Sequence, residues 1–227
     1  MLVRCVDVVH RVGEGAGERL VLDEVSCALA PGRMVALMGP SGSGKSTLLN
    51  IMGGLLQPSS GRVVVNGTAI EAMSADELTE FRGTNVGFVF QEWNLVRDLT
   101  VIENVALPLR LAGVPRRRSN QLALAALERV GVDHLMGGFP DKISGGEQQR
   151  VAIARAVVDD RRLILADEPT GALDQANGAR VLTLLRSLVD GGERGCIIAT
   201  HDSAVAARCD TVWRIVDGRI EQRDAAR

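Results

Sequence analysis

Short apolar segments recur along the chain and alternate with segments of helical periodicity. A strand is predicted wherever an apolar run, or an alternation of apolar and polar residues, is bounded by turn-forming residues. The strands predicted in this way are residues 2–9, 20–29, 34–38, 62–66, 86–90, 163–166 and 196–200. A final hairpin is predicted to turn at Asp217-Gly218. The run from Leu163 to Ala166 is wholly apolar, which is typical of parallel strands buried on both faces.

Helical periodicity fills most of the remaining sequence. The shorter predicted helices are 45–56, the segment that follows the capping-box sequence at Ser74, and 178–190. The longest helical stretch is 100–158, which turn residues interrupt at 113–115 and at 131–140. Strands that alternate with helices indicate an α/β fold. The long helical stretch indicates an α-helical subdomain inserted into that fold.

The composition narrows the class of protein. The 227 residues are 46% hydrophobic and 24% charged, as in a globular chain. A net charge of −2 and an aromatic content of 3% give no reason to expect nucleic-acid binding. The four cysteines lack metal-binding spacing, so we expect small buried hydrophobes in a reducing compartment. No apolar run is long enough for a membrane span and no signal peptide is recognisable, so we expect a soluble, cytoplasmic protein.

One of the only two lysines in the chain lies in a glycine-rich loop between a predicted buried strand and a predicted helix. The loop fits the pattern G-x-x-x-x-G-K-[ST] and comprises Gly39, Pro40, Ser41, Gly42, Ser43, Gly44, Lys45, Ser46 and Thr47. Its glycines allow backbone N–H groups to surround phosphate oxygens, and the helix N-terminus adds partial positive charge. We expect Lys45 to reach the β- and γ-phosphates of a nucleotide and Ser46 to ligate Mg²⁺.

Two carboxylates follow the apolar strand at 163–166. The carboxyl end of a parallel strand lies at the edge of the sheet where ligands bind. Asp167 at this position could hold Mg²⁺, directly or through water, and Glu168 could polarise an attacking water. Together with the phosphate loop, the pair favours phosphoryl transfer to water.

A second serine-glycine turn precedes the last helical segment of the long stretch. Ser144 is predicted to cap this helix, with Glu147 closing a capping box. Gly145 and Gly146 would leave bare N–H groups at the helix entrance, which favours a second anion site without its own lysine. Such a site could complete a nucleotide bound on a twofold-related copy.

These ordered motifs closely resemble those of the ATP-binding cassette (ABC) family over nearly the whole chain. The pieces are the phosphate loop, Gln91, the signature ISGGEQQR, the strand LILADE, the loop Gly171-Ala172-Leu173-Asp174, and His201. The stretches GFVFQEWNL, VIENVALPL and ILADEPTGALD are most similar to the ATPase subunits of the macrolide-export, lipoprotein-release and cell-division group of bacterial ABC systems.

The resemblance implies an α/β fold with a P-loop NTPase (RecA-like) core, a small antiparallel β subdomain and the inserted α-helical subdomain. Residues 1–227 would form a single nucleotide-binding domain. Its catalytic core would span about 1–91 and 159–227, and its helical subdomain about 92–158.

The resemblance also implies an ATP hydrolase that binds ATP and Mg²⁺ in a head-to-tail homodimer. Residues 39–47 of one copy and the turn from Ser144 to Glu147 of the other would hold each ATP. Gln91 would sense Mg²⁺ and nucleotide, and Asp174 would couple the two sites. His201 would contact the γ-phosphate and hold the attacking water near Glu168.

An integral membrane permease is the second implied partner. A groove near Trp93, Asn94, Leu95 and Val96 would receive one of its cytoplasmic helices, and Trp93 alone could equally belong to the subdomain core. The protein would then lie on the inner face of the cell membrane, bound through the permease.

The sequence departs from the usual family pattern at the adenine contact and within the signature, where Ile143 also replaces the more usual Leu. The family usually has an aromatic residue on the loop between the first two strands that stacks on adenine, but no aromatic residue precedes Phe81 here. The matching position is Val12, with His10 nearby, so we expect loose base selectivity. Glu147 stands where many members have Gln, and we expect its carboxylate to face its own backbone.

Four classes of function are to be distinguished for a chain with these motifs. The leading one is an ATPase that drives an export-type or mechanotransmitting permease. A regulatory ATPase acting on a membrane or envelope partner without solute transport has the same motifs. A DNA-maintenance ATPase is disfavoured because the sequence lacks sustained heptads between the phosphate loop and the signature. Glu168 and His201 argue against a scaffold that binds nucleotide without hydrolysing it.

Overall fold

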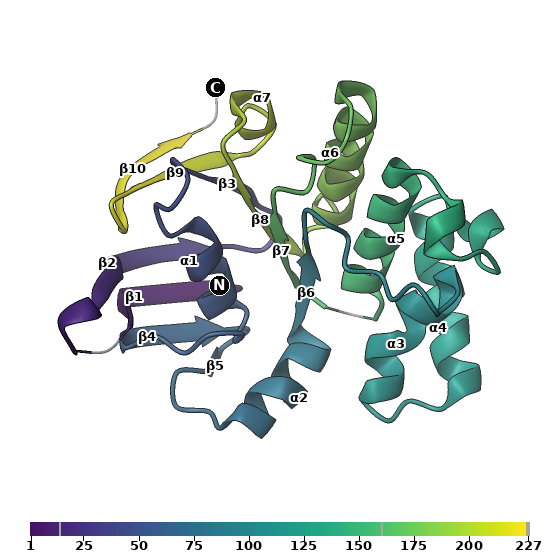
Figure 1. Cartoon of the computed structure of the whole chain (residues 1–227), viewed down its shortest axis with the longest axis horizontal. Coiled ribbons are helices and arrows are strands. Elements are labelled where there is room, and N and C mark those ends of the chain that lie inside the picture. Colours follow the sequence, from purple (N-terminus) through teal and green to yellow (C-terminus); the bar gives the residue numbers. More distant parts are fainter. Residues whose placement is uncertain (14, 160, 226–227) are drawn as a thin grey trace.

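A largely parallel sheet forms the centre of the molecule (Figure 1). The computed structural model describes residues 1–13, 15–159 and 161–225. The strand order of this sheet is β10-β9-β3-β8-β7-β6, and β10 alone runs antiparallel to its neighbour. The strands are β3 (Met34–Met38), β6 (Val86–Val89), β7 (Leu163–Asp167), β8 (Gly195–Thr200), β9 (Thr211–Val216) and β10 (Arg219–Ala225).

An antiparallel sheet lies beside the central one, at the left of Figure 1. Its order is β2-β1-β4-β5. The strands are β1 (Val3–Val12), β2 (Arg19–Leu29), β4 (Ser60–Val65) and β5 (Thr68–Ala69). The short helix η1 (Gly15–Gly17) lies in the turn between β1 and β2.

The helices flank the central sheet and are connected by short turns. They are α1 (Lys45–Met52), α2 (Ala75–Asn85), α3 (Val101–Leu111), α4 (Arg116–Arg129), α5 (Gly145–Val157), α6 (Gln175–Val189) and α7 (Ser203–Ala206), with 3-10 turns η2 (Asp133–Leu135) and η3 (Pro140–Lys142). Capping boxes begin α2 at Ser74, α3 at Thr100 and α5 at Ser144. Within the described residues, no helix combines the length and the apolar character that a membrane span requires.

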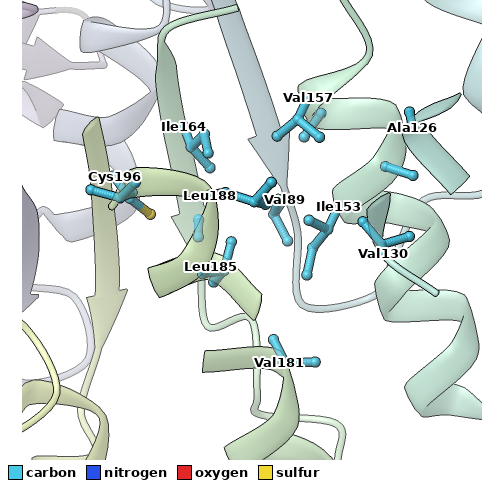
Figure 2. Packing of buried hydrophobic residues seen from close by; sticks show 14 of the residues in the cluster. Val89, Ala126, Val130, Ile153, Val157, Ile164, Val181, Leu185, Leu188 and Cys196 are labelled. Carbon is cyan, nitrogen blue, oxygen red and sulfur yellow. The ribbon is translucent and has the colours of Figure 1, made fainter. Parts of the chain in front are cut away.

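The central sheet is covered on both faces, because side chains along a strand alternate between its two sides. On β3, Met34 and Ala36 belong to one buried cluster, whereas Val35 and Leu37 belong to the other. The first cluster joins the sheet to α3, α4, α5 and α6, and the second joins it to α1, α2 and the antiparallel sheet. Figure 2 shows the first cluster, in which α5 and α6 meet strands β6, β7 and β8.

The structure confirms the predicted α/β organisation and the breaks between the helices of the long helical stretch. Two predicted helix boundaries are wrong. Helix α1 ends at Met52 rather than at residue 56, and Gly53 follows it in close contact with the ring of Phe88. Helix α6 begins at Gln175 rather than at residue 178, because the side chain of Asp174 accepts a hydrogen bond from Asn177 N–H and caps the helix.

Candidate functional site

The glycine-rich loop connects β3 directly to the N-terminus of α1. Gly44 caps α1 in the left-handed conformation, at φ 102°, and no side chain accepts a bond from the first turn. A β-carbon at Gly39 would collide with the carbonyl oxygen of Ile215 in β9, so this position requires glycine. The first turn of α1 therefore presents unpaired backbone N–H groups, an arrangement suited to phosphate.

Lys45 is 9% exposed and is held by the loop that precedes it. Its ammonium group donates to the carbonyl oxygens of Gly39 at 2.7 Å and Pro40 at 2.9 Å. These bonds fix the charge beside the loop, where a lysine can exchange the carbonyl oxygens for those of a phosphate.

A cavity of about 880 Å³ opens over this loop. The side chains and backbone that line it come from the carboxyl ends of the parallel strands, from the loop and from β2. The lining residues are Arg19, Val21, Ser41, Gly42, Gly44, Lys45, Ser46, Thr47, Phe90, Gln91, Glu92, Asn94, Asp167, Glu168, Gly171 and His201. Gly39, Pro40 and Ser43 belong to the loop but do not line this cavity as the structure describes it.

Glu168 stands at the end of β7 with its side chain held from two directions. Its Oε1 lies 2.7 Å from Nδ1 of His201, and the hydroxyl of Thr200 donates to its Oε2 at 3.3 Å. The Glu168 backbone adopts a left-handed conformation, with φ at 45°, and its N–H donates to the carbonyl oxygen of Ala199. Because β7 and β8 are neighbouring parallel strands, residues that follow them meet at one edge of the sheet.

Thr200 was not predicted as a site residue. It is fully buried at the end of β8, and its hydroxyl also accepts a hydrogen bond from the N–H of Asp202 at 3.1 Å. Its only signal in the sequence is a hydroxyl at the end of an apolar strand, directly before His201.

The predicted magnesium ligands Ser46, Gln91 and Asp167 all line the cavity. A hydroxyl, an amide and a carboxylate supply hard oxygen donors. Because these are only three protein donors, positions remain for phosphate and water oxygens, as Mg²⁺ prefers. The donor set therefore fits Mg²⁺ bound together with a nucleotide.

The signature turn, residues 144–147, does not line the cavity in the described structure. Ser144 caps α5, and its backbone N–H and its hydroxyl donate to the Glu147 carboxylate at 2.8 and 2.7 Å. These hydrogen bonds lower the pKa of Glu147 below its ordinary value. The expectation that Glu147 faces its own backbone is confirmed.

The two glycines of the signature turn pack against other segments of the same chain. A β-carbon at Gly145 would lie 3.1 Å from the ring of Trp93, and one at Gly146 would lie 3.0 Å from Oδ1 of Asn177. Asn177 in turn donates to both carboxylate oxygens of Asp174. The small size of these glycines thus lets the signature turn fit between the segment after Gln91 and the start of α6.

Arg155 of α5 reinforces the same junction. Its guanidinium donates to the carbonyl oxygens of Trp93, at 2.7 Å, and Asn94. Trp93 and Asn94 both adopt left-handed conformations, at φ 54° and 49°. Burial lowers the pKa of Arg155 to about 10, which leaves the group charged at neutral pH.

The segment from Trp93 to Val96 differs from the predicted permease groove. Trp93 packs on Gly145, and Leu95 packs against the first buried cluster. An apolar groove of about 770 Å³ does lie nearby, but only Asn94 of this segment lines it. Its apolar walls are Leu55, Val86, Phe88, Phe90, Pro108, Leu111, Ala112 and Ala156.

Neither candidate for the missing adenine contact lines the phosphate cavity in the described structure. Val12 is 53% exposed at the end of β1, and His10 has a buried Nδ1 without a hydrogen-bond partner among the described residues. Arg19 and Val21 of β2 line the cavity instead.

Known proteins share this arrangement over most of the chain. A family model described as "ABC transporter" matches residues 22–171. An ABC transporter ATP-binding protein of Mycobacterium tuberculosis, Rv0986, is 46% identical over 91% of this chain and 84% of its own. The macrolide export ATP-binding/permease protein MacB of Vibrio parahaemolyticus is 41% identical over 97% of this chain and 34% of its own. The chain therefore spans about a third of the length of that two-part relative.

The fold has equally close counterparts among solved structures. The ATP-binding cassette MJ0796, described as a dimer in a post-hydrolysis state bound to ADP and Pi, superposes with a TM-score of 0.89. It is 36% identical, and the match covers 99% of both chains. This similarity confirms the predicted P-loop NTPase fold. From its sequence, fold and phosphate loop, the chain belongs to the ABC transporter family as an ATP-binding subunit.

Proposed function

We propose that this chain hydrolyses ATP as a head-to-tail homodimer and thereby drives an export-type or mechanotransmitting permease. The observation that carries the proposal is the convergence of Lys45, Gln91, Asp167, Glu168 and His201 on a single cavity. These residues come from separate parts of the sequence, and together they supply the positioning and the charge that phosphoryl transfer to water requires. We take residues 1–227 as one nucleotide-binding domain, with its core at about 1–91 and 159–227 and its helical subdomain at 92–158.

In the proposed mechanism, the backbone of residues 39–47 holds the phosphates of ATP and Lys45 neutralises charge on the terminal ones. Mg²⁺, when bound to Ser46, Gln91 and Asp167, would withdraw charge from the phosphate oxygens. The Glu168 carboxylate accepts a hydrogen bond from an attacking water and orients it. Thr200 and His201 hold that carboxylate in place, and His201 also lines the cavity, which supports its predicted contact with the γ-phosphate.

The second wall of each ATP site comes, in this proposal, from the partner copy. Ser144, Gly145, Gly146 and Glu147 lie away from the cavity of their own chain, at a helix N-terminus that favours an anion. Asp174 is linked to that turn through Asn177, which supports its predicted role in coupling the two sites. The dimeric solved relative supports the same assembly.

The apolar groove beside Asn94 supports a membrane partner. Leu111 on its rim is 81% exposed, and exposed apolar surface of this kind marks protein contacts. We therefore place the permease helix there rather than over Trp93. The protein would lie on the cytoplasmic side of the membrane, bound through the permease and without a nucleic-acid partner.

Replacement of Glu168 by Gln tests the catalytic part. We expect the purified chain to hydrolyse ATP, and Glu168→Gln to lower kcat by roughly 10²–10⁴-fold while ATP binding is retained. Light scattering should then show a dimer with Mg²⁺ and saturating ATP. A variant that remained monomeric under these conditions would contradict the proposed assembly.

Substitution of the groove tests the permease part. Leu111→Asp should abolish co-purification with the permease while leaving ATP hydrolysis by the isolated chain unchanged. Solute movement in vesicles containing the complex would support a transporter. ATP-dependent conformational change without solute movement would support the regulatory alternative.

A further inference from the structure

Strand β2 passes close to the phosphate loop and lines the cavity over it. A β-carbon added at Gly44 would lie 2.7 Å from Cδ2 of Leu22 and 2.9 Å from the carbonyl oxygen of Val21, so this part of β2 touches the loop. Arg19 lies two residues before Val21 on the same face of the strand and lines the same cavity. Two residues of a strand span about 7 Å, so Arg19 lies farther along the strand from the contact with Gly44, and we take this part of the cavity as the position of the base.

The Arg19 guanidinium is available to a ligand. The side chain is exposed and makes no hydrogen bond or ion pair with the residues that the structure describes. Other cations near β2 are engaged, since Arg11 of β1 pairs with Glu18 at 3.3 Å and Arg219 of β10 pairs with Asp23 of β2 at 2.6 Å. Arg19 is therefore the cation that faces the cavity with no intramolecular partner among the described residues.

We propose that Arg19 stacks its guanidinium plane on the nucleotide base and determines base affinity in place of the missing aromatic residue. The inference rests on the proposed function, because it requires a nucleotide in this cavity. A guanidinium is planar and weakly hydrated, and it stacks on π-faces in a way that an ammonium group does not. Such stacking tolerates different bases, because every base has a π-face.

The test compares a nucleoside diphosphate with inorganic diphosphate, because neither carries a γ-phosphate to hydrolyse. Calorimetry with Mg²⁺ present would measure the affinity of the full chain for ADP, GDP and pyrophosphate. We expect Arg19→Ala to weaken ADP and GDP by a similar factor, roughly three- to tenfold, and to change pyrophosphate by less than about twofold. Arg19→Lys keeps the charge but loses the plane, so it should weaken ADP nearly as much.

Arg11→Ala is the matched control, because Arg11 lies on the same hairpin but is already paired with Glu18. It should leave all three affinities unchanged. Val12 lies directly opposite Arg19 in the β1–β2 register, so Val12→Tyr should restore ADP affinity in the Arg19→Ala background.

Three results would overturn the inference. If Arg19→Ala weakened the binding of ADP and of pyrophosphate equally, Arg19 would act on the phosphates. If Arg19→Lys bound ADP with full affinity, the effect of Arg19 would be one of charge. No change in Arg19→Ala, with ADP still bound by the unmodified chain, would remove Arg19 from the site while leaving the proposed function intact. A chain that bound neither ADP nor pyrophosphate would refute the proposed function itself.

Discussion

The phosphate loop and the signature turn both place a helix N-terminus at the surface, but they are built differently. Helix α1 begins at Gly44 without a side-chain cap, beside Lys45, and three oxygen donors share its cavity. Helix α5 begins at Ser144, where a capping box with Glu147 is closed, and its turn lies outside that cavity. The uncapped terminus lies beside a lysine and three oxygen donors, whereas the signature turn at the capped one carries no lysine, and its serine is hydrogen-bonded to the Glu147 carboxylate. The difference fits the proposal that the phosphate loop holds the nucleotide and that the signature turn of a second copy completes its site.

The largest expected effect is the recovery of ATP hydrolysis when two inactive variants are mixed. Lys45→Ala disables the phosphate loop, and Ser144→Arg blocks the signature turn, so each variant alone should lose about 99% of ATP hydrolysis. If the two regions meet between copies, a mixed dimer contains one intact composite site. The mixture should then regain up to about a quarter of unmodified activity, from the statistics of pairing and of one working site in two. Steady-state phosphate release as a function of mixing ratio measures this.

The control for that experiment is each variant mixed with the unmodified chain, which calibrates the activity of single-site dimers. A mixture of the two variants that stayed at the level of either alone would place both regions in the same chain's site.

A smaller effect is expected where the signature turn contacts Trp93. A β-carbon at Gly145 would lie 3.1 Å from the Trp93 ring, so Gly145→Ala should lower the free energy of unfolding by about 1–2 kcal/mol through overpacking. Trp93→Leu should relieve this crowding, so the double variant should lose less than the sum of the single losses. Urea denaturation of all four chains measures the coupling.

Gly137→Ala provides the comparison for that series, because among the described residues no atom beyond its chain neighbours lies within 4 Å of a β-carbon built there. Its effect should be near zero. Strictly additive losses for Gly145 and Trp93 would show that the turn does not depend on this contact.

The smallest expected effect is a change in the pH dependence of the melting temperature. The pKa of Glu147 is lowered by its hydrogen bonds to Ser144, so the charged form stabilises the folded chain. That contribution is complete above the unfolded pKa of about 4.3 and is lost as pH falls through the lower folded value. Glu147→Gln can close the same box without charge, so its melting temperature should fall less between pH 5 and pH 3. Parallel slopes for the two chains would argue against the capping carboxylate.

Features that depend on neighbouring residues could be predicted from the sequence, whereas features that depend on contacts between distant segments could not. The loop around Lys45 and the strand before Asp167 were predictable because strand, turn and helix signals are written within a few residues of each other. The end of α1 was placed too late because the signal there is tertiary, since Gly53 packs against Phe88 from another strand. The start of α6 differs from the prediction for a local reason, because Asp174 caps the helix before its apolar periodicity becomes clear.

The site shows the same division. The positions of Glu168 and His201 follow from strand ends, but the role of Thr200 depends on which strand lies beside β7. The packing of Trp93 on Gly145 joins residues far apart in sequence, and nothing in the spacing of either residue predicts it. The wall formed by Arg19 depends on where β2 passes the phosphate loop, which a single sequence does not state.

The two-sided central sheet has a mechanical consequence. Helices α3, α4 and α5 contribute to one buried cluster, while α1 and the antiparallel sheet contribute to the other. The two clusters share the strands of the sheet, and β3, which ends at the phosphate loop, contributes Met34 and Ala36 to the cluster on the helical side. A displacement of the helical layer would therefore be transmitted through this strand to the loop that we propose holds the nucleotide.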